Sequence, residues 1–106
     1  MSMKLLTEEI KKRLPALYST QDIEDPIVQV KYFTPDSNWT WYILEGSEQD
    51  NGDWLFFAYV IGLESEYGYV LLSELESAKG PLGLSIERDL HFYPKPISHI
   101  LKKKGA

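Results

Sequence analysis

Residues 54–61 read Trp-Leu-Phe-Phe-Ala-Tyr-Val-Ile and open the longest strongly apolar run in the chain. Apolar side chains occupy both alternating phases of this stretch, which is typical of a central β-strand covered on both faces. A short buried helix produces a similar run, so that alternative stays open. The polar loop at residues 46–53 contains an Asn51-Gly52 pair, which favours positive φ and marks the turn before the strand.

Further strands are predicted on both sides of this stretch. β-Branched and aromatic residues fill 27–33 and 39–44, and the turn residues between them indicate a hairpin. Residues 68–72 predict a fourth short strand. Residues 82–92 alternate between apolar and polar side chains, so we expect a last strand with one face in solvent.

Three helices are expected around this sheet. Thr7, followed by acidic and then basic residues, predicts an N-terminal helix that ends at Leu14. Ser73 and Glu76 have the spacing of a capping box and predict a helix over about 73–79. Apolar residues from Ile97 onward predict a short C-terminal helix. The sequence therefore predicts a single α+β domain over residues 1–106, with a mainly antiparallel sheet of about four to five strands.

The composition narrows the class of protein. The 106 residues are 43% hydrophobic and 13% aromatic, which is enough to build one buried core. The chain has no cysteine, and this excludes disulfides, thiolate nucleophiles and zinc or iron–sulfur sites built on sulfur. No signal-peptide core and no membrane-length apolar run occur, so we expect a cytoplasmic protein without membrane association. The Lys102–Lys104 run is interpreted as a solvated helix end.

Charge is segregated along the sequence, because residues 32–78 contain nine carboxylates and no lysine or arginine. Clustered loops would give these carboxylates a negative field that attracts a basic protein surface and opposes direct binding of nucleic acid. The alternative is that they serve only to keep an acidic protein in solution. Eight of these nine carboxylates form the candidate acidic binding patch, and Glu76 is the one left out of it. The eight are Asp36, Glu45, Glu48, Asp50, Asp53, Glu64, Glu66 and Glu74.

A second candidate site lies near the C-terminus, where Glu87, Asp89 and His91 share the polar phase of the expected last strand. Adjacent positions of one straight strand converge poorly on a metal ion, so an exposed strand face is favoured over a metal or acid–base site. Arg88 interrupts the apolar phase and needs a carboxylate or carbonyl partner if it is buried. It therefore predicts either a structural ion pair or an anion-binding group.

These residues support an alternative function, a small enzyme or ligand-binding domain built on Arg88, Asp89 and His91, with Asp36 and Asn38 added from a loop. The chain contains neither a glycine-rich phosphate loop nor a nucleophile elbow. No cofactor is indicated, and catalysis is disfavoured.

Nine aromatic residues within the acidic segment, residues 32–78, could form a base-stacking platform for nucleic acid. Such platforms are interleaved with lysine and arginine, which this segment lacks. Core packing and cross-strand pairing are favoured, although an exposed subset could still contact a protein. These aromatic residues are Trp39, Trp41, Tyr42, Trp54, Phe56, Phe57, Tyr59, Tyr67 and Tyr69.

Several short strings together resemble a known bacterial family. They are LLTEE at 5–9, VKYFTPD at 30–36, NWTWY at 38–42, GYV at 68–70, LSELE at 72–76, GPLGL at 80–84 and IERDLHF at 86–92. The chain resembles, over about residues 5–96, the uncharacterised family numbered 2958 among the domains of unknown function. The resemblance implies no established activity. It implies a setting on phages, plasmids and conjugative elements, sometimes beside antirestriction-type genes.

The charge segregation and this setting lead to one expectation. The chain is expected to be a non-catalytic acidic binding protein of a mobile element, for example an anti-defence inhibitor that engages a basic surface of a nucleic-acid-handling host protein. A monomer or a small homo-oligomer is expected.

Overall fold

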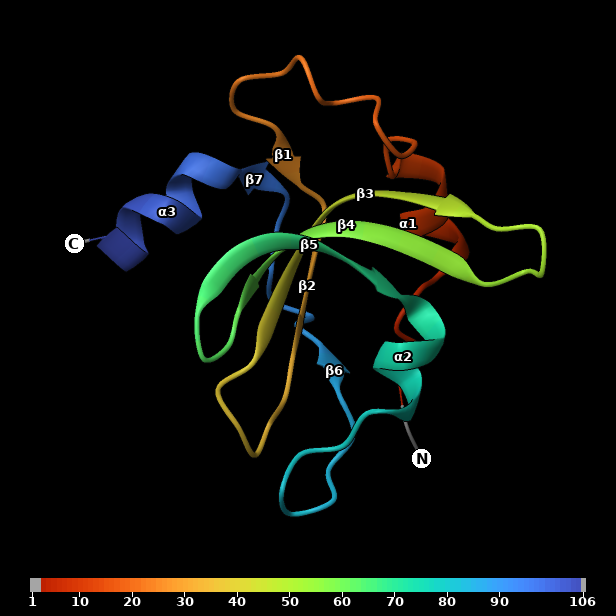
Figure 1. Cartoon of the computed structure of the whole chain (residues 1–106), viewed down its shortest axis with the longest axis vertical. Helices are drawn as coiled ribbons and strands as arrows, with labels where there is room; N and C mark the ends of the chain where they lie inside the picture. Colours follow the sequence, from red (N-terminus) through yellow and green to blue (C-terminus); the bar gives the residue numbers. More distant parts are fainter. Residues whose placement is uncertain (1–2, 106) are drawn as a thin grey trace.

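The computed structural model describes residues 3–105, with side chains through residue 102. Its strands form a five-stranded antiparallel sheet in the order β5-β4-β3-β2-β6 and a separate two-stranded pair of β1 with β7 (Figure 1). The elements are α1 (Glu8–Arg13), β1 (Ile27–Val28), β2 (Val30–Phe33), β3 (Thr40–Glu48), β4 (Trp54–Ile61), β5 (Ser65–Leu71), α2 (Leu72–Ser77), β6 (Glu87–Arg88), β7 (Lys95–Pro96) and α3 (Ile97–Gly105). The α+β prediction is confirmed.

The apolar stretch at 54–61 is a strand with both faces covered. β4 pairs with β3 on one side and with β5 on the other. Phe56 and Ala58 lie in one buried cluster, and Tyr59 lies in the other. Because apolar residues are needed on both faces of β4, its sequence lacks the alternation of a half-exposed strand.

The first cluster packs α1 and α2 against the sheet. Ile10 of α1 and Leu75 of α2 meet Ile43 and Phe56 of the sheet there. Thr7 caps α1, since its hydroxyl oxygen accepts the Ile10 backbone N–H at 3.2 Å. The expected start and end of this first helix are therefore confirmed.

The second cluster packs α3 against the opposite face of the sheet. Ile97 and Ile100 of α3 meet Leu44 and Tyr59 there. The start of α3 is fixed by Asp25, whose carboxylate accepts the Ser98 backbone N–H at 2.9 Å and the Ser98 hydroxyl at 2.7 Å. These two hydrogen bonds hold the loop before β1 next to the C-terminal helix.

The capping box predicted for the second helix is wrong in its residues. α2 begins at Leu72, and the Glu74 carboxylate, not that of Glu76, accepts the backbone N–H of Leu71 at 2.8 Å. The Ser73 hydroxyl instead donates to Asp53 at 2.6 Å. Leu71 is the last residue of β5, and α2 follows it without a loop. The helix therefore starts one residue earlier than the predicted position 73.

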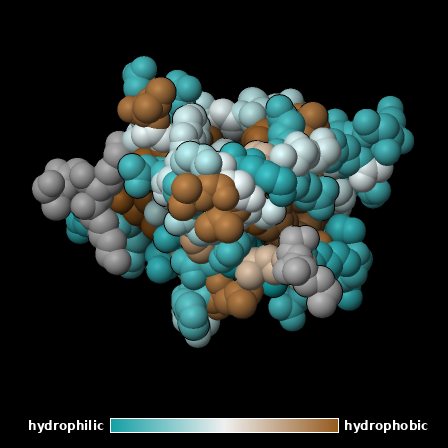
Figure 2. Space-filling view, turned by 90° about the horizontal axis from the view of Figure 1, so that it is seen from below, coloured by the Kyte–Doolittle hydropathy of each residue, from teal (hydrophilic) through white to brown (hydrophobic). Residues whose placement is uncertain are grey.

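The strand predicted over residues 82–92 is also wrong for most of its length, since only β6 at 87–88 is formed. Asp36 from the β2–β3 turn accepts the backbone N–H groups of Leu82 at 2.7 Å and Leu84 at 3.3 Å, which folds this segment into a loop. Both leucines are exposed. In Figure 2, which views this end of the molecule, apolar residues appear as separate groups among hydrophilic ones.

Candidate functional site

Glu45, predicted in the acidic patch, is buried and cannot belong to an exposed surface. β3 extends to Glu48 and has a bulge at Leu44, so Glu45 lies within the strand and not in a loop. Only 2% of the surface of Glu45 is exposed. Its carboxylate accepts the backbone N–H of Tyr18 at 2.8 Å and that of Thr20 at 2.9 Å, together with the Thr20 hydroxyl. Glu45 therefore holds the loop before β1 against the sheet.

Four of the other predicted acidic residues gather near the β3–β4 hairpin. Glu48 and Asp50 are exposed at its end. Asp53 is bound to Ser73 at the start of α2, and Glu74 follows one residue later. The hydrogen bond from the Ser73 hydroxyl lowers the pKa of the Asp53 carboxyl. Asp53 and Glu74 thus accept hydrogen bonds within the domain, whereas Glu48 and Asp50 remain open to a partner.

The three remaining acidic residues lie at the opposite end of the sheet. Glu64 lies in the turn from β4 to β5, Glu66 is the second residue of β5, and Asp36 lies in the turn from β2 to β3. The length of β4 places these turns more than about 20 Å from the β3–β4 hairpin. The predicted acidic patch is therefore not one surface. In a sheet of consecutive antiparallel strands, successive connecting loops lie at opposite ends of the sheet.

Arg88 is held by backbone carbonyl groups, and within the described residues it forms no ion pair. Its guanidinium donates to the backbone carbonyl oxygen of Lys4 and, at 3.5 Å, to that of Leu5. These bonds attach the chain before α1 to β6. Glu87 is exposed beside it, so neither of these two residues joins Asp89 and His91 in the cavity described next.

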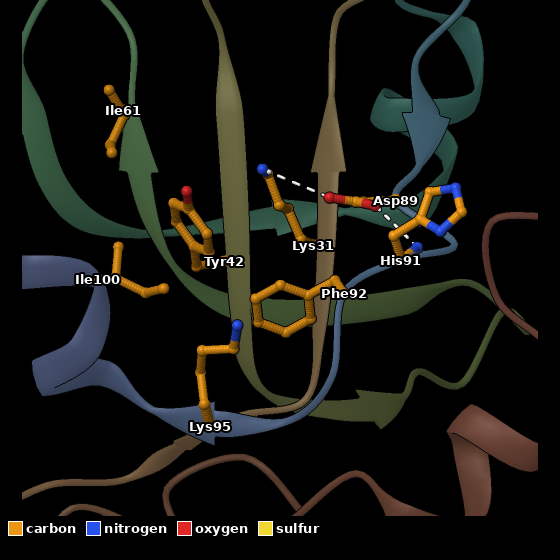
Figure 3. A pocket seen from close by; sticks show the side chains of 8 residues that line it. All are labelled: Lys31, Tyr42, Ile61, Asp89, His91, Phe92, Lys95 and Ile100. Atoms are coloured by element: carbon orange, nitrogen blue, oxygen red, sulfur yellow. Dashed lines mark hydrogen bonds and ion pairs between the residues drawn. The ribbon is translucent and has the colours of Figure 1, made fainter. Parts of the chain in front are cut away.

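Asp89 and His91 line a cavity of about 400 Å³ between the sheet and the segment that leads into α3 (Figure 3). We call it the Lys95 cavity. Its lining residues are Lys31, Tyr42, Ile61, Asp89, His91, Phe92, Lys95 and Ile100. They come from β2, β3, β4, β7 and α3 and from the segment after β6, so five elements and one loop position them.

The polar wall of the Lys95 cavity is built on Asp89. Its carboxylate lies 3.4 Å from the Lys31 ammonium group and accepts the His91 backbone N–H at 2.9 Å. The Asp89 backbone N–H in turn donates to the carbonyl oxygen of Lys31 at 2.9 Å. Lys31 and Asp89 are 28% and 24% exposed, so the pair is partly shielded from water and holds the segment after β6 onto β2.

The aromatic wall carries the second ammonium group. The Lys95 nitrogen lies 4.8 Å from the centre of the Phe92 ring, and the Tyr42 and Phe92 rings are 6.2 Å apart with a 52° tilt. Figure 3 shows this nitrogen beside the Phe92 ring, while the His91 imidazole is turned away from Tyr42 and Ile61. Among the described side chains no ion pair involves Lys95. It is therefore the cation in this cavity that is open to a ligand.

Sequence reasoning singles out Asp89 and His91 and names Tyr42 only among the aromatic residues, whereas it does not single out Lys31 or Lys95. The signal available for Lys31 was weak, since a lone lysine in a strand usually marks an exposed face. Lys95 stands between Pro94 and Pro96, two residues that interrupt a strand, and this local pattern does not indicate a binding group. Within residues 3–102 no three His, Asp or Glu side chains are grouped as a metal site would require.

The fold and the cavity together define a small α+β domain with a cavity between its antiparallel sheet and the segment that leads into α3. The chain belongs to the family described as "Protein of unknown function (DUF2958)", which matches residues 5–104. No curated protein and no solved structure matches the chain. Among the described helices, none has the length and apolar character needed to cross a membrane.

Proposed function

We propose that the chain is a non-catalytic binding protein that takes a small organic anion into the Lys95 cavity. One observation supports this proposal above the others: the Lys95 ammonium group lies over the Phe92 ring in a cavity of ligand size and forms no ion pair with any described side chain. Ligand pockets are commonly of this volume and combine apolar walls with a few polar groups that fix the ligand's orientation.

The walls indicate which kind of anion fits. A carboxylate or phosphate group is attracted to Lys95 and can accept a hydrogen bond from it. A flat apolar body fits against Tyr42 and Phe92, and Ile61 and Ile100 extend the apolar surface. The ligand class is therefore an aromatic or similarly flat carboxylate or phosphate.

Binding is favoured over catalysis because neither Asp89 nor His91, the two residues of the cavity that could exchange protons, is placed for acid–base chemistry. Asp89 is already engaged by the Lys31 ammonium group and by a backbone N–H. The His91 imidazole is directed away from the aromatic wall (Figure 3). A general acid–base pair needs both groups within hydrogen-bond reach of one substrate atom, and this arrangement supports no such convergence.

Lys95→Gln is expected to weaken the binding of phenyl phosphate about tenfold, because the loss of one charge-assisted hydrogen bond has roughly this effect. Calorimetric titration of the purified chain measures it. Lys102→Gln, an exposed lysine of α3 outside the cavity, is the matched control and should change little. Benzyl alcohol, which has a similar shape without the charge, should bind more weakly than phenyl phosphate. Equal affinity of the two variants would refute the proposed role of Lys95.

A second candidate function is supported by Glu48 and Asp50. Both are exposed at the end of the β3–β4 hairpin, and no ion pair within the described residues involves them. This hairpin could engage a basic surface of a nucleic-acid-handling host protein, as expected for an anti-defence inhibitor carried by a mobile element in the cytoplasm. The surface is smaller than the eight-residue patch, because Glu45 is buried and three residues lie at the other end.

Reversing both charges, with Glu48→Lys and Asp50→Lys, is expected to reduce the salt-sensitive capture of such a partner at least tenfold. The measurement is pull-down from nuclease-treated host lysate at low and high salt, with quantification of the retained protein. Glu64→Lys with Glu66→Lys reverses the same number of charges at the opposite end and is the matched control. Retention that ignores both the hairpin charges and the salt concentration would eliminate this candidate.

A further inference from the structure

The β5 edge of the sheet is open. β5 pairs with β4 along all seven of its residues, and within the described chain no strand pairs with its other side. Natural sheets protect such edges with lysine, proline, a bulge or a very short strand. β5 carries one charged residue, Glu66, but residues 65–71 contain no lysine, arginine or proline, and they pair with β4 without a register shift.

The opposite edge of the same sheet is protected. β6 is only two residues long, and Pro94 and Pro96 follow it closely. The contrast matters because a long unprotected edge exposes a row of backbone donors and acceptors that can template another strand. The β5 edge is thus the side of the molecule on which a strand can be added.

An aromatic surface borders the open edge. Tyr67 and Tyr69 lie on one face of β5 and are 47% and 51% exposed. Their rings lie 5.7 Å and 5.1 Å from that of Phe57, and Tyr18 extends the surface at 6.3 Å from Tyr69. Burial raises the pKa of the Tyr67 hydroxyl. Half-exposed tyrosines on a rigid strand are typical of residues that become covered in an interface.

We infer that β5 pairs antiparallel with the β5 strand of a second copy of this chain, so that the two sheets join across a twofold axis. The antiparallel register centred on Gly68 gives the longest overlap. The Leu71 N–H is already bound to the Glu74 carboxylate at 2.8 Å, so the pairing runs over residues 66–70 of both copies. In that register Tyr67 faces Tyr69 of the second copy, where aromatic cross-strand pairs are favourable. Glu66 faces Val70 of the second copy, so no charged residue of β5 opposes its own copy. This self-complementarity favours a second copy over an unrelated strand.

Gly68 leaves the centre of this interface open. A Cβ atom built there meets no atom within 4 Å, and the backbone does not adopt a positive φ. A side chain at this position is therefore compatible with the folded monomer, whereas in the pair it would stand directly opposite its own copy. This makes position 68 suited to testing the interface without disturbing the fold.

Sedimentation velocity of the full chain, over a range of concentrations, is expected to report a dimer. Gly68→Lys is expected to raise the dimer dissociation constant at least tenfold, because two like charges then meet at the twofold axis. Gly68→Ala, which adds bulk without charge, is the matched control and should leave dimerisation nearly unchanged. Leu63→Lys adds the same charge at an exposed position outside β5 and should also have little effect.

A chain that sediments as a monomer at all concentrations would overturn the inference. A dimer that Gly68→Lys leaves intact would overturn it as well, because the contact would then lie elsewhere. Far-ultraviolet circular dichroism checks that each variant is folded, and Tyr67→Lys supplies a second charged substitution on the same edge. The outcome is independent of ligand binding, since the Lys95 cavity includes no residue of β5.

Discussion

Phe56→Ala is expected to lower the free energy of unfolding by about 4 kcal/mol, as large-to-small substitutions of buried aromatic residues do. Phe56 is fully buried at the centre of β4, and its ring lies 6.2 Å from that of Tyr32. A Cβ atom on Gly46 of the neighbouring strand would lie 2.8 Å from the Phe56 ring, which shows how closely the ring packs on the backbone there. The truncation leaves a cavity that so dense a site cannot close.

Urea unfolding followed by tryptophan fluorescence measures this change. A loss of this size is a large part of the 5–15 kcal/mol that holds most small domains folded, so Phe56→Leu is a second variant with a smaller expected loss. Leu63→Ala is the control, because Leu63 is 94% exposed, and its loss should stay below about 0.5 kcal/mol. Similar losses at positions 56 and 63 would contradict the buried position of β4.

The parts of the fold that the sequence predicts are those with local causes. The apolar run at 54–61, the Thr7 cap and the apolar spacing of α3 each act within a few residues, and each element is present. Residues 82–92 were assigned wrongly because their alternation imitates a strand. The group that folds them into a loop is the Asp36 carboxylate, 46 residues away from Leu82.

The candidate site was predicted only in part for a similar reason. Asp89 and His91 stand out because they are neighbours in the sequence. Lys31 and Lys95 are 64 positions apart, and only the pairing of β2 with β3 and the docking of α3 bring them into one cavity. The eight acidic residues do not form one patch, because successive loops of an antiparallel sheet lie at opposite ends even when they are close in the sequence. Charge segregation along a chain is therefore not charge segregation in space.

Glu45→Ala is expected to lower the free energy of unfolding by about 3 kcal/mol, the second large effect. The substitution leaves the partly buried backbone N–H groups of Tyr18 and Thr20 without their acceptor, and each unsatisfied buried donor costs about 1–3 kcal/mol. Tyr18 also has a φ of 70°, an uncommon conformation for a residue with a side chain, which persists only where its surroundings enforce it. The carboxylate of Glu45 is part of that enforcement.

Glu48→Ala provides the comparison, because Glu48 is the same residue type three positions further along β3 but is exposed. Its loss should stay below about 0.5 kcal/mol. Glu45→Gln keeps one acceptor oxygen and should fall between the two, since its NH₂ group then faces a donor. Limited proteolysis distinguishes local from global effects: cleavage within residues 15–26 should rise for Glu45→Ala and not for Glu48→Ala. Equal stability of the two alanine variants would contradict the buried position of Glu45. Glu45 would then be an exposed acidic residue and would belong with Glu48 and Asp50 to the proposed partner-binding surface of the β3–β4 hairpin.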